Sequence, residues 1–117
     1  MNKKILAISI LMLMACTMVA FAQNADANAL ARDAQGAVQR ASNARRNALA
    51  SSDPVQVLRQ ADIIMENHGR VARQFNNLIN RGVEISDFNA RNISRDLERM
   101  DSYFHAVRHH HGRLLMR

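Results

Sequence analysis

The chain has 117 residues, of which 16 are lysine or arginine and 10 are aspartate or glutamate, and its formal net charge is +6. This length suits one domain, and a domain of this size buries too little of its surface to enclose a large active site. The single cysteine excludes an intrachain disulfide, so the fold must rely on packing alone.

The first 22 residues have the pattern of a secretory signal peptide. Residues 2–4 form a short positive segment that contains Lys3 and Lys4, and residues 5–19 form a largely apolar run. The small residues Ala20 and Ala22 then precede Gln23 as in a cleavage site. We therefore expect residues 1–22 to be removed and the mature protein, residues 23–117, to be periplasmic or secreted.

Two other interpretations of this segment stay open. Residues 13–16 resemble a bacterial lipobox, in which Cys16 would become the lipidated first residue of a membrane-associated lipoprotein. Met14 fits that motif poorly, and residues 17–22 are apolar where lipoproteins usually become polar. The third interpretation is an uncleaved anchor, since a run of about 18 residues lies at the lower limit for crossing a bilayer.

Cleavage after Ala22 would change the composition of the protein. The mature chain would have no cysteine and no lysine, and its 14 arginines against 10 carboxylates would give a net charge of +4. The planar guanidinium group of arginine suits recognition of carboxylate or phosphate. Arginine is also a good helix former, so its abundance alone does not establish such a role.

Three helical segments are expected, at about residues 24–50, 54–81 and 87–112. The strongest boundary signal is Asp53, which suits the N-cap and is followed by Pro54 at the first helical position and by Gln56 at capping-box spacing. Gly82 suits the left-handed residue that ends a helix, and Ser86 suits the next N-cap. No alternation typical of strands occurs anywhere in the sequence.

Apolar residues repeat at heptad spacing and predict one broad apolar stripe on each helix. In the second segment the rows are Val57, Ile64, Val71 and Leu78, beside Leu58, Met65, Ala72 and Ile79. In the third segment the main row is Ile93, Met100, Val107 and Leu114. The first segment has a mostly alanine row: Ala27, Leu30, Ala34, Ala37, Ala41, Ala44 and Ala48. These patterns predict an all-α fold with coiled-coil-like packing: an up-down-up three-helix bundle, or a long helical hairpin completed by self-association as a homo-oligomer.

A possible metal site lies in the third segment. Glu98, Asp101, His105 and His109 follow one another at helical spacing on one face, and carboxylate plus imidazole suits zinc, copper or nickel. A solvent-exposed polar face predicts the same residues, and Asp101 four positions before His105 is an ordinary surface ion pair. A metal-binding or metal-buffering role is therefore an alternative function, and no cofactor is otherwise indicated.

Folding the three segments back on one another predicts a strongly basic end. The turn near Ser52 brings Arg45 and Arg46 level with Arg59, and the third segment adds Arg108. Three histidines at positions 109–111 lie in the same region. Such an end attracts anions through its long-range field. The six arginines of this candidate anion-binding site are Arg45, Arg46, Arg59, Arg108, Arg113 and Arg117.

The sequence favours binding over catalysis. It contains no Gly-x-Ser-x-Gly motif and no glycine-rich phosphate loop, and the mature chain has no cysteine. The expected partner is an envelope protein or another anionic envelope component, such as a phospholipid surface that the basic end could contact. Nucleic acid is the least favoured partner, because the few aromatic residues follow the core rows and leave no stacking platform.

Overall fold

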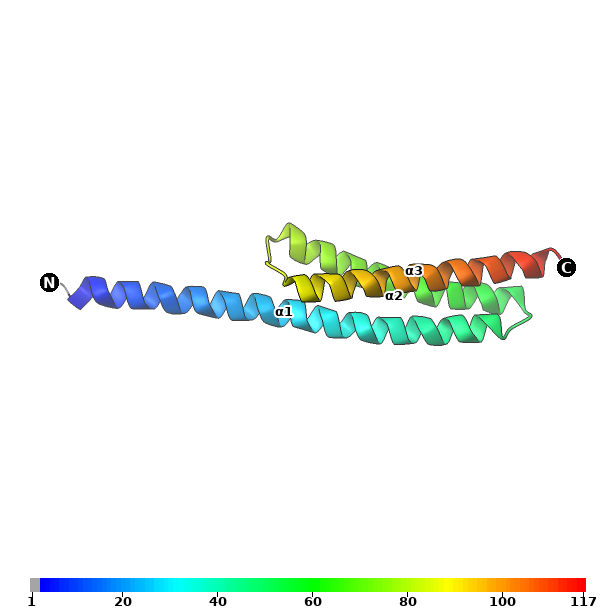
Figure 1. The fold of residues 1–117 in the computed structure, drawn as a ribbon, viewed down its shortest axis with the longest axis horizontal. Coiled ribbons are helices and arrows are strands. Elements are labelled where there is room, and N and C mark those ends of the chain that lie inside the picture. The colour runs from blue at the N-terminus through cyan, green and yellow to red at the C-terminus, as the bar shows by residue number, and fades with distance from the viewer. Residues whose placement is uncertain (1–2) are drawn as a thin grey trace.

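The computed structural model describes the backbone of residues 3–117 and the side chains of residues 25–117. It contains three helices, α1 (Lys3–Leu49), α2 (Pro54–Asn80) and α3 (Asp87–Leu115), and no strand within residues 3–117 (Figure 1). Each helix packs against the other two. The prediction of an all-α three-helix bundle is confirmed.

The helix α1 begins earlier than residue 24, where the sequence predicts its start. It runs without a break from Lys3 to Leu49, because no glycine or proline occurs in the chain before Gly36. The predicted leader, with its cleavage site and Cys16, lies outside the residues whose side chains are described. Within the part of the chain that could be assessed, no helix is both long enough and apolar enough to cross a membrane.

The turn between α1 and α2 forms as its residues predict. The Asp53 side chain accepts a hydrogen bond from the Val55 backbone N–H at 3.1 Å, and Pro54 occupies the first helical position. The Ser51 hydroxyl accepts a second bond from the Asp53 N–H, also at 3.1 Å. These bonds satisfy donors at the exposed start of α2 and fix the point at which the chain reverses.

The turn between α2 and α3 is a Schellman motif. Gly82 has a φ of 72°, which is costly for any residue with a Cβ atom, and its N–H donates to the Ile79 carbonyl at 3.0 Å. The N–H of Val83 donates to the Leu78 carbonyl at 3.0 Å, and the side chains of Val83 and Leu78 are both buried. Ser86 then caps α3 by accepting from the Asn89 N–H at 3.2 Å.

The core combines small residues from α1 with large ones from α2 and α3. Every member of the predicted alanine row of α1 is buried. Because alanine is small, the backbone of α1 approaches the other two helices closely, and the larger side chains fill the centre. The largest fully buried side chains are Ile64, Ile93, Met100, Val57, Val71 and Val107.

The apolar stripe predicted for α2 is buried along only part of its width. The row that begins at Val57 faces the core, whereas Leu58, Met65 and Ile79 of the neighbouring row are exposed. In a bundle of three, both neighbours of a helix lie on the same side of it, so the apolar residues farthest from them remain in water. The predicted apolar stripe of α2 is therefore wider than the face that the core covers.

Candidate anion-binding site

The six predicted arginines lie at one end of the bundle, where α1 ends, α2 begins and α3 ends. Arg45 and Arg46 are in the last turns of α1, and Arg59 is in the second turn of α2. The end of α3 joins this region because the His110 Nε2–H donates to the Ser51 carbonyl at 2.8 Å. The remaining members of the set are Arg108 and Arg113, near the end of α3, and Arg117, the last residue.

Two of these arginines lie on aromatic rings. The guanidinium carbon of Arg45 is 5.8 Å from the centroid of the Tyr103 ring on α3, and that of Arg108 is 5.9 Å from the Phe104 ring. A cation over an aromatic face is attracted to the ring but keeps its full charge and its free N–H donors. The rings therefore position these two side chains without neutralising them.

Among residues 25–117, three of the eight arginines outside this end have a carboxylate partner within ion-pair distance, and the six of this end have none. In the other half, Arg70 pairs with Asp33 and Arg81 with Asp26, each at 3.6 Å. The basic end consequently carries concentrated charge that the described side chains leave available to an anion.

Part of this basic character has a purely structural cause. Arg46 lies in the last turn of α1 and Arg113 in the last turn of α3. The carbonyls at a helix C-terminus carry partial negative charge, so a cation there stabilises the helix by about 0.3–1 kcal/mol. Two parallel helices that end together thus favour arginines at one end even without a ligand.

The candidate metal site is only partly assembled. The His105 Nε2 and Asp101 Oδ2 atoms are 3.5 Å apart, and Glu98 and His109 are exposed on the same helix. No group of three or more potential ligands converges among residues 25–117. Because stable zinc sites use at least three protein ligands, the described geometry favours the anion site over the metal site.

The sequence analysis missed a polar network between α1 and α2. Asn67 is buried, and its Oδ1 accepts from Arg40 Nε while its Nδ2 donates to the Ile63 carbonyl, both at 2.8 Å. Arg40 and Arg70 both approach Asp33, at 3.8 and 3.6 Å. Asn67 lies outside the apolar rows, and only the crossing of the two helices brings Arg40 to it. A single buried asparagine of this kind can set the alignment of two helices.

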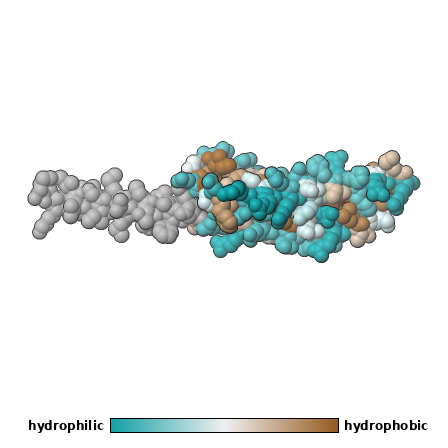
Figure 2. Space-filling model, viewed as in Figure 1, coloured by the Kyte–Doolittle hydropathy of each residue, from teal (hydrophilic) through white to brown (hydrophobic). Residues whose placement is uncertain are grey.

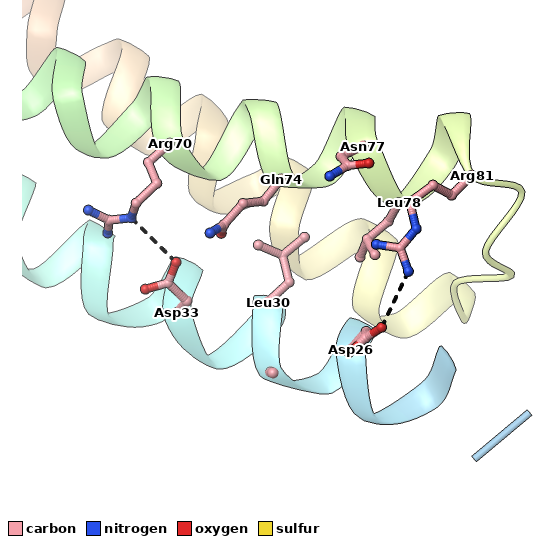
Figure 3. A pocket seen from close by; sticks show the side chains of 9 residues that line it. Asp26, Leu30, Asp33, Arg70, Gln74, Asn77, Leu78 and Arg81 are labelled. Carbon is pink, nitrogen blue, oxygen red and sulfur yellow. Dashed lines mark ion pairs between the residues drawn. The ribbon is translucent and has the colours of Figure 1, made fainter. Parts of the chain in front are cut away.

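An open groove between α1 and α2 lies next to this network. It has a volume of about 490 Å³ and is bordered by the pairs Asp33–Arg70 and Asp26–Arg81, with Leu30, Leu78 and amide side chains between them (Figure 3). Its charged groups are already paired with each other. The groove therefore has fewer unpaired charges with which to bind a charged ligand than the basic end has.

Asp96 is a buried carboxylate on the α1 side of α3. It borders a second open groove, of about 420 Å³, together with Arg32, Gln35 and Arg99. Burial raises the pKa of Asp96 above its usual value of 3.8, and the positive charges of Arg99 and Arg95 oppose that rise. The folded protein therefore binds a proton at this position more tightly than the unfolded chain does.

We expect Asp96→Asn to stabilise the protein at neutral pH and to change the pH dependence of its stability. Since the pKa of Asp96 is raised by folding, the stability that it contributes is complete below pH 3.8 and is lost as the pH rises through the folded-state pKa. Asparagine cannot titrate, so the variant should lack this loss. Urea unfolding measured from pH 3 to pH 7 would test this, with exposed Glu84→Gln as the control. Parallel pH profiles for the natural protein and Asp96→Asn would contradict it.

Comparisons with known proteins found no relative of this chain. No family model matches the chain, and neither a curated protein nor a solved structure matches it significantly.

Proposed function

We propose that this protein is an exported helical binding protein whose basic end captures an anionic component of the cell envelope. The observation that carries the proposal is the set of six arginines that lie together without a carboxylate partner among the described residues. Export rests on the signal-peptide pattern of residues 1–22. Binding, and not catalysis, is the activity that this arrangement favours.

The shape of the basic end favours an extended anionic surface over a small anion. Its arginines are spread over three helix ends and the last residue, and all except the half-buried Arg45 are exposed. A phosphate ion could contact few of them at once, whereas a polyanion or a sheet of anionic head groups could contact most of them. Each arginine near such a surface contributes about 1 kcal/mol.

The position of the basic end also bears on the alternative of lipidation at Cys16. The helix α1 enters the bundle near residue 25 and reaches the basic end only at Leu49, the far end of the bundle (Figure 1). A lipid anchor on Cys16 would therefore lie beyond the end of the bundle that is opposite the basic end. In a lipoprotein of this design, the basic end would face away from the anchoring membrane and toward another anionic partner.

Binding to vesicles provides the direct test of this function. We expect the purified protein to sediment with vesicles of equal parts phosphatidylglycerol and phosphatidylcholine, but not with phosphatidylcholine alone. Replacing Arg45, Arg46 and Arg108 together with glutamine should weaken this binding about 10- to 100-fold, because three charges near the surface are lost. Raising the salt concentration should weaken binding of the natural protein more steeply than that of the variant.

A matched control separates the basic end from net charge. Replacing Arg32, Arg91 and Arg95 with glutamine removes the same charge from the other half of the bundle. This control should lose less than about threefold in affinity, since its charges lie away from the contact. Equal losses in the two triple variants would show that net charge alone drives binding. Failure of the natural protein to bind at low salt would overturn the proposal for anionic lipid.

A further inference from the structure

The helix α2 carries a second heptad pattern on the face that points away from the bundle. Its positions alternate in steps of three and four residues, as the contact positions of a coiled coil do. We call this row the outer seam, and it extends over about 36 Å of helix at 1.5 Å per residue. Its members are Val55, Leu58, Asp62, Met65, Gly69, Ala72, Asn76 and Ile79.

The large apolar residues of the outer seam are in water. Val55, Leu58, Met65 and Ile79 are between 41% and 62% exposed, whereas the inward-facing Val57 is fully buried. The surface in Figure 2 is mainly hydrophilic, with an apolar patch where α2 turns into α3. An exposed apolar row with coiled-coil spacing is typical of a face that is covered by another helix.

A row of charges that follows the outer seam indicates what covers it. Arg59, Glu66 and Arg73 succeed one another at heptad spacing, and all three are exposed. None of them forms an ion pair within the part of the chain whose side chains are described. The Arg73 side chain lies along the seam, with its Nη1 atom 3.2 Å from where a Cβ atom on Gly69 would stand. The row thus presents alternating charges, positive, negative and positive, beside an apolar strip.

We propose that the outer seam binds the outer seam of a second copy of this chain, antiparallel, in a twofold-symmetric dimer. In an antiparallel pair of helices the same flanking row meets itself across the interface. An offset of one heptad places Glu66 of each copy against an arginine of that row in the other copy. The small residues Gly69 and Ala72 let the two α2 backbones approach closely once the Arg73 side chain turns away from Gly69.

A parallel pairing fits this surface less well. It would place Asp62 of one copy directly against Asp62 of the other, in the middle of the apolar strip. It would also bring the two basic ends side by side, where their charges repel. The antiparallel dimer instead directs the two basic ends in opposite directions. Arg59 belongs to both surfaces, but Leu58, Met65 and Glu66 lie outside the anion-binding set, so variants at those three residues test the assembly separately from anion binding.

Sedimentation velocity of the purified protein tests the apolar part of the proposal. We expect a dimer at micromolar concentration, and we expect Leu58→Glu with Met65→Glu to raise the dimer dissociation constant at least tenfold. Both side chains are exposed in the single bundle, so helical circular dichroism should be preserved. The control is Phe88→Glu, an exposed apolar residue outside the seam, which should leave the dimer intact. A natural protein that stays monomeric up to 100 μM overturns the proposal and leaves the seam to a different partner.

Charge exchange tests the orientation of the two copies. Glu66→Arg makes the flanking row entirely positive, and Arg59→Glu with Arg73→Glu makes it entirely negative. Each variant alone should be at least tenfold weaker as a dimer, and an equimolar mixture should recover dimers that contain one copy of each. Exposed Glu98→Arg, which makes the same charge change on α3, should have no effect. If the mixture stays monomeric while the natural protein dimerises, the antiparallel arrangement is wrong.

Discussion

Replacing Ile64 with alanine is expected to lower the free energy of unfolding by about 2–5 kcal/mol. Ile64 lies in the middle of α2, is fully buried, and belongs to the core cluster that also contains Ile93 and Met100. The substitution removes buried methyl groups and leaves a cavity, because the alanine side chains that α1 contributes to the core are too short to fill it. A domain this small has a total stability of only about 5–15 kcal/mol, so a large fraction would be lost.

Urea unfolding followed by circular dichroism measures this effect. The matched control is Leu115→Ala, which removes a comparable side chain from an exposed position near the end of α3. Its cost should remain below about 0.5 kcal/mol, as for most surface substitutions. A loss of less than about 1 kcal/mol for Ile64→Ala would contradict the described core. The comparison thus tests which side of α2 faces inward.

Replacing Ala41 with leucine is expected to destabilise the bundle by about 1–3 kcal/mol. Ala41 lies in the middle of the alanine row, and its side chain is completely buried in the core cluster. A leucine at this position must push α1 away from its neighbours or adopt a strained rotamer, because a packed interior has no spare volume. The outcome distinguishes a closely packed α1 from one that lies loosely on the other two helices.

The same substitution at an exposed alanine is the control for Ala41→Leu. Ala29 is on α1 but faces solvent beside the groove, so Ala29→Leu should change the stability by less than about 0.5 kcal/mol. Both variants would be compared by thermal unfolding and by urea unfolding. Equal effects at the two positions, or a stabilised Ala41→Leu, would show that α1 does not pack as closely as described.

The helix caps, the turns and the buried faces of two helices are the parts of this fold that could be predicted from the sequence. Asp53, Gly82 and Ser86 act within one or two turns of themselves, because caps and turns depend on hydrogen bonds between near neighbours in the chain. The alanine row of α1 and the row of Ile93 in α3 are long enough to identify the buried faces of those two helices. The start of α1 could not be predicted, since a signal-peptide cleavage site need not interrupt a helix.

The candidate anion site was predictable only as a set of positions. Short turns require the ends of the helices to meet, so Arg45, Arg59 and Arg108 could be expected at one end of the bundle. The Tyr103 ring beneath Arg45, and the bond from His110 to the Ser51 carbonyl, depend on how each helix is rotated about its axis. The contact between Phe104 and Arg108, four residues apart on α3, is local and does not depend on that rotation. Heptad spacing leaves that rotation open when a helix has two adjacent apolar rows.

The sequence by itself therefore determined that this chain forms three helices, where the turns before α2 and α3 lie, and that one end is rich in arginine. Only the tertiary structure decided which row of α2 is buried and which becomes the outer seam. It also decided that Asn67 and Asp96 are buried and that Asp33 pairs with arginines. The physical reason is that caps and periodicity act over a few residues, whereas burial and ion pairing depend on where a second helix lies.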